Sequence, residues 1–170
     1  MNHIIVEDKL RDTNPVPVVI AFTPNYFIPA STCLYSIFAS LDIEEQMHVI
    51  CLLSEELTDR LKQKIQLIGG ERAQYSFINL QGRLQNIYID AKYTEAASYR
   101  LLLPDLLPEY DKVMYIDCDI IVRNNLVKLY RSVDLGNHYL AAVFEAPMDF
   151  QLGHLKVLGC HPDEYVNSGF

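Results

Sequence analysis

The chain has 170 residues, 50% hydrophobic and 21% charged, which is typical of one globular domain with a substantial core. Its net charge of −8 argues against a nucleic-acid-binding surface or a polybasic membrane patch. No apolar run approaches the roughly 20 residues that span a bilayer, and the first residues contain no signal-peptide core. The four cysteines have no paired spacing, which favours buried free thiols and a cytoplasmic protein.

Residues 1–15 are interpreted as a polar leader and residues 16–170 as one domain. Val18–Phe22 is an apolar run rich in β-branched residues, which predicts a first buried strand. Pro29 is placed to open a helix whose apolar residues recur at helical spacing as far as Leu41. A strand, a short turn and a packing helix form the opening of a βα nucleotide-binding unit.

Two more strands follow this unit. His48–Leu53 predicts the second strand, and Ser54 is predicted to cap a helix that Gly69 and Gly70 end. Gln74–Leu80 predicts the third strand. This alternation of strands and helices predicts an α/β fold, with a mostly parallel sheet covered by helices on both faces.

The stretch between residues 99 and 126 carries the main chemical signal. Val113–Ile116 predicts a buried strand, and Asp117-Cys118-Asp119 follows it. Two carboxylates this close repel each other and are costly to bury unless a cation lies between them, and their oxygens suit Mn²⁺ or Mg²⁺. The alternative is a pair of solvent-facing turn residues. The apolar runs on both sides favour a strand end, where open α/β sheets bind ligands.

Further motifs precede this pair in a characteristic order. Arg100 lies on a predicted helix that Thr94 caps, Leu103-Pro104 makes a turn, and Asp111-Lys112 leads into the strand. With the Asp-x-Asp, this series resembles glycosyltransferase family 8, whose members are retaining, metal-dependent sugar transferases that include lipopolysaccharide glucosyl- and galactosyltransferases and glycogenin. The resemblance covers about residues 16–170. It implies a nucleotide-binding, Rossmann-like sheet of the GT-A type.

The resemblance also implies an activity. A hexose would pass from a UDP-sugar to a hydroxyl of a glycan or lipooligosaccharide, with retention at the anomeric carbon. The enzyme would be cytoplasmic, or peripheral at the inner face of the membrane.

Several site residues are carried over by the same resemblance. Asp117 and Asp119 would bind Mn²⁺ (or Mg²⁺) against the donor diphosphate, with Cys118 between them at the donor site. Arg100 would act near the donor sugar as a catalytic residue, and the alternative for it is a surface salt bridge to Glu95. Asn167, which opens an Asn-Ser-Gly sequence, would be a second catalytic residue near the reacting sugars.

The loop after the first strand would hold the nucleotide's uracil and ribose. Ala21, Phe22, Thr23, Asn25 and Tyr26 fall on the family's pattern there. Thr23 departs from it, because many members have an Asp at this place, so the choice of nucleotide is less specified than the fold. For Asn25 and Tyr26 ordinary turn chemistry is the alternative.

The C-terminal part predicts one more buried strand, His138–Phe144, and a partly amphipathic segment over residues 150–158. The resemblance ends in the strand that Asn167 opens, so we expect an incomplete GT-A domain. It would lack the family's His that completes the metal site and a Lys that binds the diphosphate. Such a domain would expose apolar edge surface, which predicts dimerisation or poor solubility.

Three other functions remain open. The chain could be a non-catalytic remnant or fragment that at most binds UDP. A haloacid-dehalogenase-type phosphatase also has an Asp-x-Asp after a strand, but its first Asp normally lies near the start of the domain, unlike Asp117. A nucleotidyltransferase would usually show a Gly-rich, basic loop after the first strand, and residues 23–26 have neither feature.

Overall fold

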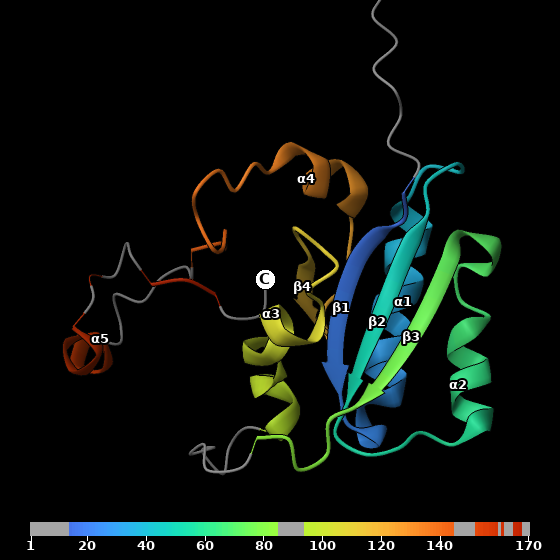
Figure 1. The fold of residues 1–170 in the computed structure, drawn as a ribbon, viewed down its shortest axis with the longest axis horizontal. Coiled ribbons are helices and arrows are strands. Elements are labelled where there is room, and N and C mark those ends of the chain that lie inside the picture. The colour runs from blue at the N-terminus through green and yellow to red at the C-terminus, as the bar shows by residue number, and fades with distance from the viewer. Residues whose placement is uncertain (1–13, 85–93, 145–151, 160, 162–164, 168–170) are drawn as a thin grey trace, which may run out of the picture.

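The computed structural model describes residues 14–84, 94–144, 152–159, 161 and 165–167 (Figure 1). Most of the predicted leader and Cys160 lie outside these residues. The helices and strands follow one another in this order: β1 (Val16–Phe22), η1 (Pro24–Tyr26), α1 (Phe27–Ser40), β2 (Met47–Leu53), α2 (Asp59–Gln66), η2 (Gly70–Arg72), β3 (Ala73–Asn79), η3 (Glu95–Leu102), α3 (Leu103–Leu106), β4 (Met114–Asp117), α4 (Leu126–Ser132) and α5 (Leu152–Leu158). The elements labelled η are 3-10 helices.

The strands form one sheet of order β3-β2-β1-β4, in which every neighbouring pair is parallel. All seven residues of β1 are buried, as expected for a central strand of a covered parallel sheet. From β1 the chain steps outward to β2 and β3, and then crosses back to place β4 on the other side of β1. The predicted α/β class with a parallel sheet is confirmed.

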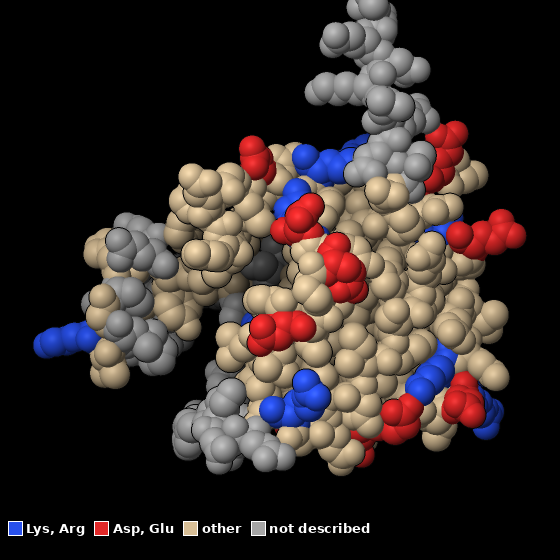
Figure 2. Space-filling view, in the orientation of Figure 1, with Lys and Arg blue, Asp and Glu red and all other residues tan. Residues whose placement is uncertain are grey.

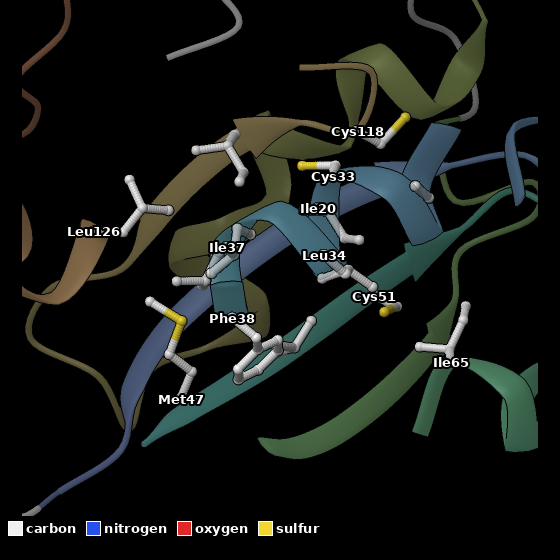
Figure 3. Close-up of a cluster of buried hydrophobic side chains, with 14 of the residues drawn as sticks. Ile20, Cys33, Leu34, Ile37, Phe38, Met47, Cys51, Ile65, Cys118 and Leu126 are labelled. Carbon is white, nitrogen blue, oxygen red and sulfur yellow. The ribbon is translucent and has the colours of Figure 1, made fainter. Parts of the chain in front are cut away.

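One face of the sheet packs against α1, α2 and α4. The side chains of α1 that recur at helical spacing point into this layer, among them Leu34 and Ile37, which are fully buried. They contact strand residues of the same face, such as Ile20 and Cys51 (Figure 3). Burial of such a set is the main favourable contribution to folding.

The opposite face packs against η3 and α3. Val19, Ile50 and Leu52 of the central strands join Tyr99 and Ala96 of η3 in a second buried cluster. The alternation of side chains along each strand divides the apolar residues between the two clusters. Helices therefore cover both faces of the sheet, as the sequence predicts.

Gly69 ends the α2 region for two physical reasons. Its φ of +83° lies in the left-handed range that side chains other than glycine rarely adopt. A Cβ at this position would also lie 2.7 Å from Cε1 of Phe38. The predicted helix stop is confirmed.

The predicted cap of α2 is wrong. Ser54 is buried directly after β2, and the helix begins at Asp59 with Thr58 at its N-cap position. Leu57 lies between them and is 2% exposed in the cluster beneath α1. Burying Leu57 keeps this segment non-helical, so tertiary packing overrides the local capping preference.

The predicted buried strand over residues 138–144 is also wrong. Tyr139, Leu140 and Val143 are exposed, and Phe144 makes an isolated antiparallel bridge with Val166. An apolar run becomes a buried strand only where a neighbouring strand and a covering layer are available. Among the described residues this segment has neither beyond that bridge.

The surface of the described residues carries charges of both signs. On the face drawn in Figure 2, acidic and basic side chains are interspersed and form no continuous basic area. Within the described ranges, no helix has the length and apolar character to cross a membrane.

Candidate functional site

The carboxyl ends of β1 and β4 lie side by side where the strand order reverses. Ala21 of β1 pairs with Asp117 of β4 in the parallel register. Ligands of open α/β sheets bind in the crevice outside such a switch point. The pairing brings the loop after β1 and the Asp-x-Asp motif, predicted separately from the sequence, to one edge of the sheet.

The loop after β1 exposes two of its predicted ligand-binding side chains. Thr23 is extended and half-buried, and the N–H of Tyr26 donates to its carbonyl oxygen at 2.8 Å, which closes the single turn of η1. Asn25 and Tyr26 are exposed, and Tyr26 has 42% of its surface accessible. Phe22 packs in the core beneath α1, so only its backbone is available to a ligand.

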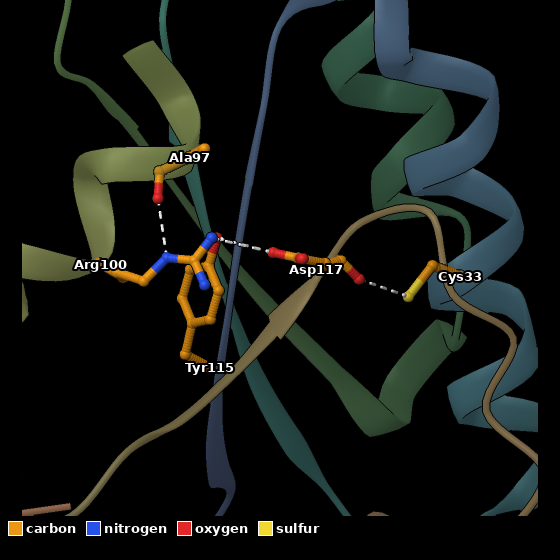
Figure 4. Close-up of polar contacts among 5 residues, drawn as sticks. All are labelled: Cys33, Ala97, Arg100, Tyr115 and Asp117. Atoms are coloured by element: carbon orange, nitrogen blue, oxygen red, sulfur yellow. Dashed lines mark hydrogen bonds and ion pairs between the residues drawn. The ribbon is translucent and has the colours of Figure 1, made fainter. Parts of the chain in front are cut away.

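Arg100 reaches the Asp-x-Asp motif from η3. Its Nη2 donates to Oδ1 of Asp117 at 3.2 Å, and its Nε donates to the carbonyl oxygen of Ala97 at 2.7 Å (Figure 4). The guanidinium also lies 4.5 Å from the centre of the Tyr115 ring, which favours a cation by its quadrupole. The structure therefore pairs Arg100 with Asp117 and not with Glu95.

Tyr115 is a site residue that the sequence reasoning missed. Its hydroxyl donates to Oδ1 of Asp117 at 3.3 Å. Burial raises the pKa of Tyr115, and the Arg100 cation lowers it by a smaller amount, so the phenol stays protonated and can donate. The signal was available, because residues two apart on a strand share one face.

The two carboxylates of the motif differ in their surroundings. Both hydrogen bonds to Asp117 end on Oδ1, while Asp119 is exposed in the turn after β4. Within the described part of the chain no three His, Cys, Asp or Glu side chains gather as a metal site. Mg²⁺ and similar hard cations are commonly held by one or two carboxylates together with substrate phosphates. The donor set therefore fits a cation shared with a diphosphate.

Cys118 anchors the motif by packing. It is 7% exposed, and the neighbouring Cys33 lies beneath it and donates to the carbonyl oxygen of Asp117 at 3.8 Å. Burial, followed by the charges of Asp119 and Asp117, raises the pKa of Cys118 to about 12. The group is a thiol at neutral pH, and metals bind the thiolate. Together with Cys51, these described cysteines are free and buried, as predicted.

Asn167 directly follows Val166 of the isolated Phe144–Val166 bridge. Its backbone N–H donates to the carbonyl oxygen of Val143 at 2.7 Å. The structure thus brings Arg100 and Asp117 into contact. The catalytic role of Asn167 stays a prediction.

Comparison with known proteins places the chain in a family. A model of glycosyl transferase family 8 matches residues 17–170. The chain belongs to this family. General stress protein A of Bacillus subtilis is 23% identical over 163 residues, which are 94% of this chain and 56% of that protein. Glycosyltransferase GlyE of Streptococcus pneumoniae is 30% identical over 108 residues, covering 62% of this chain and 26% of that protein. This family 8 chain thus matches about half the length of the Bacillus relative and about a quarter of GlyE.

Solved structures share the fold. The apo form of the bifunctional glycosyltransferase WbbM superposes with a TM-score of 0.76 at 24% identity, over 99% of this chain and 32% of that one. Galactosyltransferase LgtC, solved in complex with donor and acceptor sugar analogues, superposes with a TM-score of 0.72 at 24% identity, over 91% of this chain and 56% of that one. At this identity the likeness establishes the GT-A type fold of the family 8 chain.

Proposed function

We propose that the chain binds a UDP-sugar and transfers its hexose, with retention, to a hydroxyl of a glycan or lipooligosaccharide. Family membership supports the reaction class. The observation that carries the proposal is the contact between Arg100 and Asp117 next to Ala21, at the switch point of the sheet. A cation and a carboxylate held there by a 3-10 helix and a strand offer a preformed site for a charged ligand.

The residues of the two loops have distinct roles in this proposal. Asp117 and Asp119 would hold Mn²⁺ (or Mg²⁺), which would offset negative charge on the leaving diphosphate. Cys118 keeps the two carboxylates in place from below. The backbone of Ala21 and Phe22 supports the uridine.

Arg100 binds the donor with the part of its guanidinium that Asp117 leaves unused. Its Nη1 is buried without a hydrogen-bond partner in the described structure. An unpaired buried donor is costly, so a shift of the guanidinium that brings Nη1 to a ligand oxygen is stabilising. The planar fork of an Arg also orients sugar hydroxyls or phosphate oxygens in a way that Lys does not reproduce.

The other site residues surround the donor. Asn25 and Tyr26 contact the uracil and ribose with their exposed side chains, and Thr23 offers one hydroxyl where many members have an Asp. Asn167 binds near the reacting sugars. The choice of acceptor depends on residues outside the loops that follow β1 and β4.

Calorimetric titration tests the donor site. UDP is titrated into the chain with and without Mn²⁺, and into the Asp117→Ala, Asp119→Ala double variant. We expect binding that depends on Mn²⁺ and falls at least tenfold in the double variant, because each carboxylate–cation contact is lost. Glu55→Ala with Glu56→Ala removes two carboxylates elsewhere on the sheet edge and serves as the control. Binding that is indifferent to both Mn²⁺ and the double substitution would refute the proposal.

A turnover assay separates transfer from binding alone. The chain is incubated with UDP-hexoses, a glycan acceptor and Mn²⁺, and released UDP is measured. Release that requires Asp117 supports a transferase. Metal-dependent binding without any release supports the alternative, a chain that only binds UDP.

A further inference from the structure

The segment that carries the Asp-x-Asp motif into α4 is held by side chains of α1. Residues 120–125 belong to no helix or strand, so no ladder fixes their backbone. Side chains on one flank of α1 bond the backbone of this segment and of the motif before it. These contacts join Cys33 to Asp117 (Figure 4), Ser36 to Val122 and Ser40 to Asn124. Each of them connects residues at least 84 positions apart in the sequence.

Ser36 is the middle contact of this row and uses its hydroxyl in two directions. The hydroxyl donates to the carbonyl oxygen of Cys33 at 2.7 Å and accepts from the N–H of Val122 at 2.9 Å. Because its proton is committed to the helix, its lone pairs are left to face the segment. Val122 is half-buried and packs against the cluster beneath α1, where an N–H without an acceptor is costly.

The two carboxylates of the motif are fixed to different degrees. Asp117 belongs to β4, and two side-chain hydrogen bonds end on its Oδ1. Asp119 is exposed in the turn beyond the strand. Its backbone lies between the end of β4 and the bond from Val122 to Ser36. The position of Asp119 relative to Asp117 therefore depends on that bond.

We propose that Ser36 is a positioning residue for the cation site. Its hydroxyl fixes the turn that carries Asp119, so that both carboxylates of the motif can meet one cation. This inference rests on the proposed function and adds a residue that acts through Val122 and not by contact with the donor. A preformed pair of carboxylates binds more tightly than a pair that must be ordered during binding, because the entropy of ordering is already spent.

Hydrogen exchange tests the anchor in the free protein. In Ser36→Ala we expect the amides of residues 118–125 to exchange about fivefold faster than in wild type, because Val122 loses its acceptor. Ser31→Ala is the matched control. Ser31 is half-buried on the opposite flank of α1, and its hydroxyl bonds the carbonyl oxygen of Phe27 at 2.7 Å. This control loses an intrahelical bond of the same kind and should leave exchange in residues 118–125 unchanged.

Calorimetry tests the consequence for the site. We expect Ser36→Ala to weaken Mn²⁺-dependent UDP binding about tenfold and to leave binding of UDP without Mn²⁺ unchanged. Ser31→Ala should bind as wild type does in both conditions. Ser36→Thr should restore the affinity, because it keeps the hydroxyl. Thr32 of the same helix already bonds the carbonyl oxygen of Ile28 at 2.9 Å, so a threonine is compatible with such a bond here.

The remaining outcomes are equally decisive. Ser36→Ala that exchanges and binds as wild type does overturns the inference and leaves the proposed function standing. Faster exchange without weaker Mn²⁺-dependent binding, or the reverse, also overturns it. Equal losses in Ser36→Ala and Ser31→Ala, or a loss that Ser36→Thr does not restore, would show a general role in the stability of α1 and overturn it as well. Absence of UDP binding to wild type refutes the proposed function, and the inference with it.

Discussion

At the scale of single residues, His48 links three segments of the chain. Its Nε2 lies 2.8 Å from the Ser76 hydroxyl of β3, and its Nδ1 contacts the hydroxyl of Tyr110, which precedes β4. Burial lowers the pKa of His48 below 6.5, and the charge of Glu109 opposes this shift by a smaller amount. The neutral imidazole is therefore the form that the fold favours.

This depressed pKa predicts an acid-sensitive stability. Below pH 6.5 the unfolded chain binds a proton at His48 that the folded chain binds less readily, so the free energy of unfolding falls as the pH falls. We expect a loss of stability between pH 7.5 and 5.5 that is smaller in His48→Gln, measured by urea unfolding. Exposed His138→Gln is the control and should keep the wild-type slope. An unchanged slope in His48→Gln would contradict the prediction.

At the scale of elements, Lys112 holds the end of α4. Its Nζ donates to the carbonyl oxygens of Tyr130 and Val133 at 2.7 and 2.6 Å, and it lies 4.2 Å from the centre of the Tyr130 ring. The Tyr130 hydroxyl returns a bond of 2.7 Å to the Lys112 carbonyl. A cation at the C-terminus of a helix is also favoured by the helix dipole. These contacts explain why Lys112 stands in the motif before β4, and they require no catalytic role for it.

Replacing this lysine should be costly. Lys112→Met keeps the apolar stem and removes the charged donor, which leaves two carbonyls without their partner. We expect about 2 kcal/mol lower stability, measured by chemical unfolding. Lys64→Met, at an exposed position near the end of α2, should change stability by less than about 0.5 kcal/mol. Equal effects of the two substitutions would show that the contacts of Lys112 contribute little.

Element by element, the sequence predicts what repeats along the chain and misses what depends on distant neighbours. The apolar runs of β1, β2 and β3 and the stop at Gly69 are local patterns, and the structure confirms them. Ser54 has the local pattern of a cap, but the burial of Leu57 decides its conformation. The run over residues 138–144 is apolar enough for a strand, yet within the described part of the chain only one isolated bridge pairs with it.

The candidate site shows the same division. The Asp-x-Asp motif and Arg100 were predicted from their order in the sequence. Their contact, and the part of Tyr115 in it, depend on β4 lying beside β1, which no periodicity encodes.

At the scale of the whole molecule, β1 is the centre of stability. It is buried along its full length, has a parallel neighbour on each side and contributes to both apolar clusters. Strand β3 lies at one end of the strand order, and its residues are only partly buried or exposed. Opening of local structure begins where burial is least.

Hydrogen exchange should reveal this gradient. We expect the amides of β1 to exchange most slowly, those of β2 next, and those of β3 faster by at least tenfold, as measured by mass spectrometry on peptides from each strand. Addition of UDP and Mn²⁺ should slow exchange in the segment after β1 and in the turn after β4. Equal protection of β1 and β3 would contradict this picture of a graded sheet.

The crossing from β3 back to β4 has a consequence for the growing polypeptide on the ribosome. Strands β1, β2 and β3 can pair in the order in which they are synthesised, because only short segments of chain connect each strand to the next. The contact between Cys33 and Asp117 spans 84 residues, and closing a longer segment costs more chain entropy before any contact compensates it. The nascent chain would therefore hold a partial sheet while Asp117 and Asp119 are still unmade or undocked. Competence to bind a charged ligand would arise only in the last step, when β4 inserts beside a strand that has long been in place.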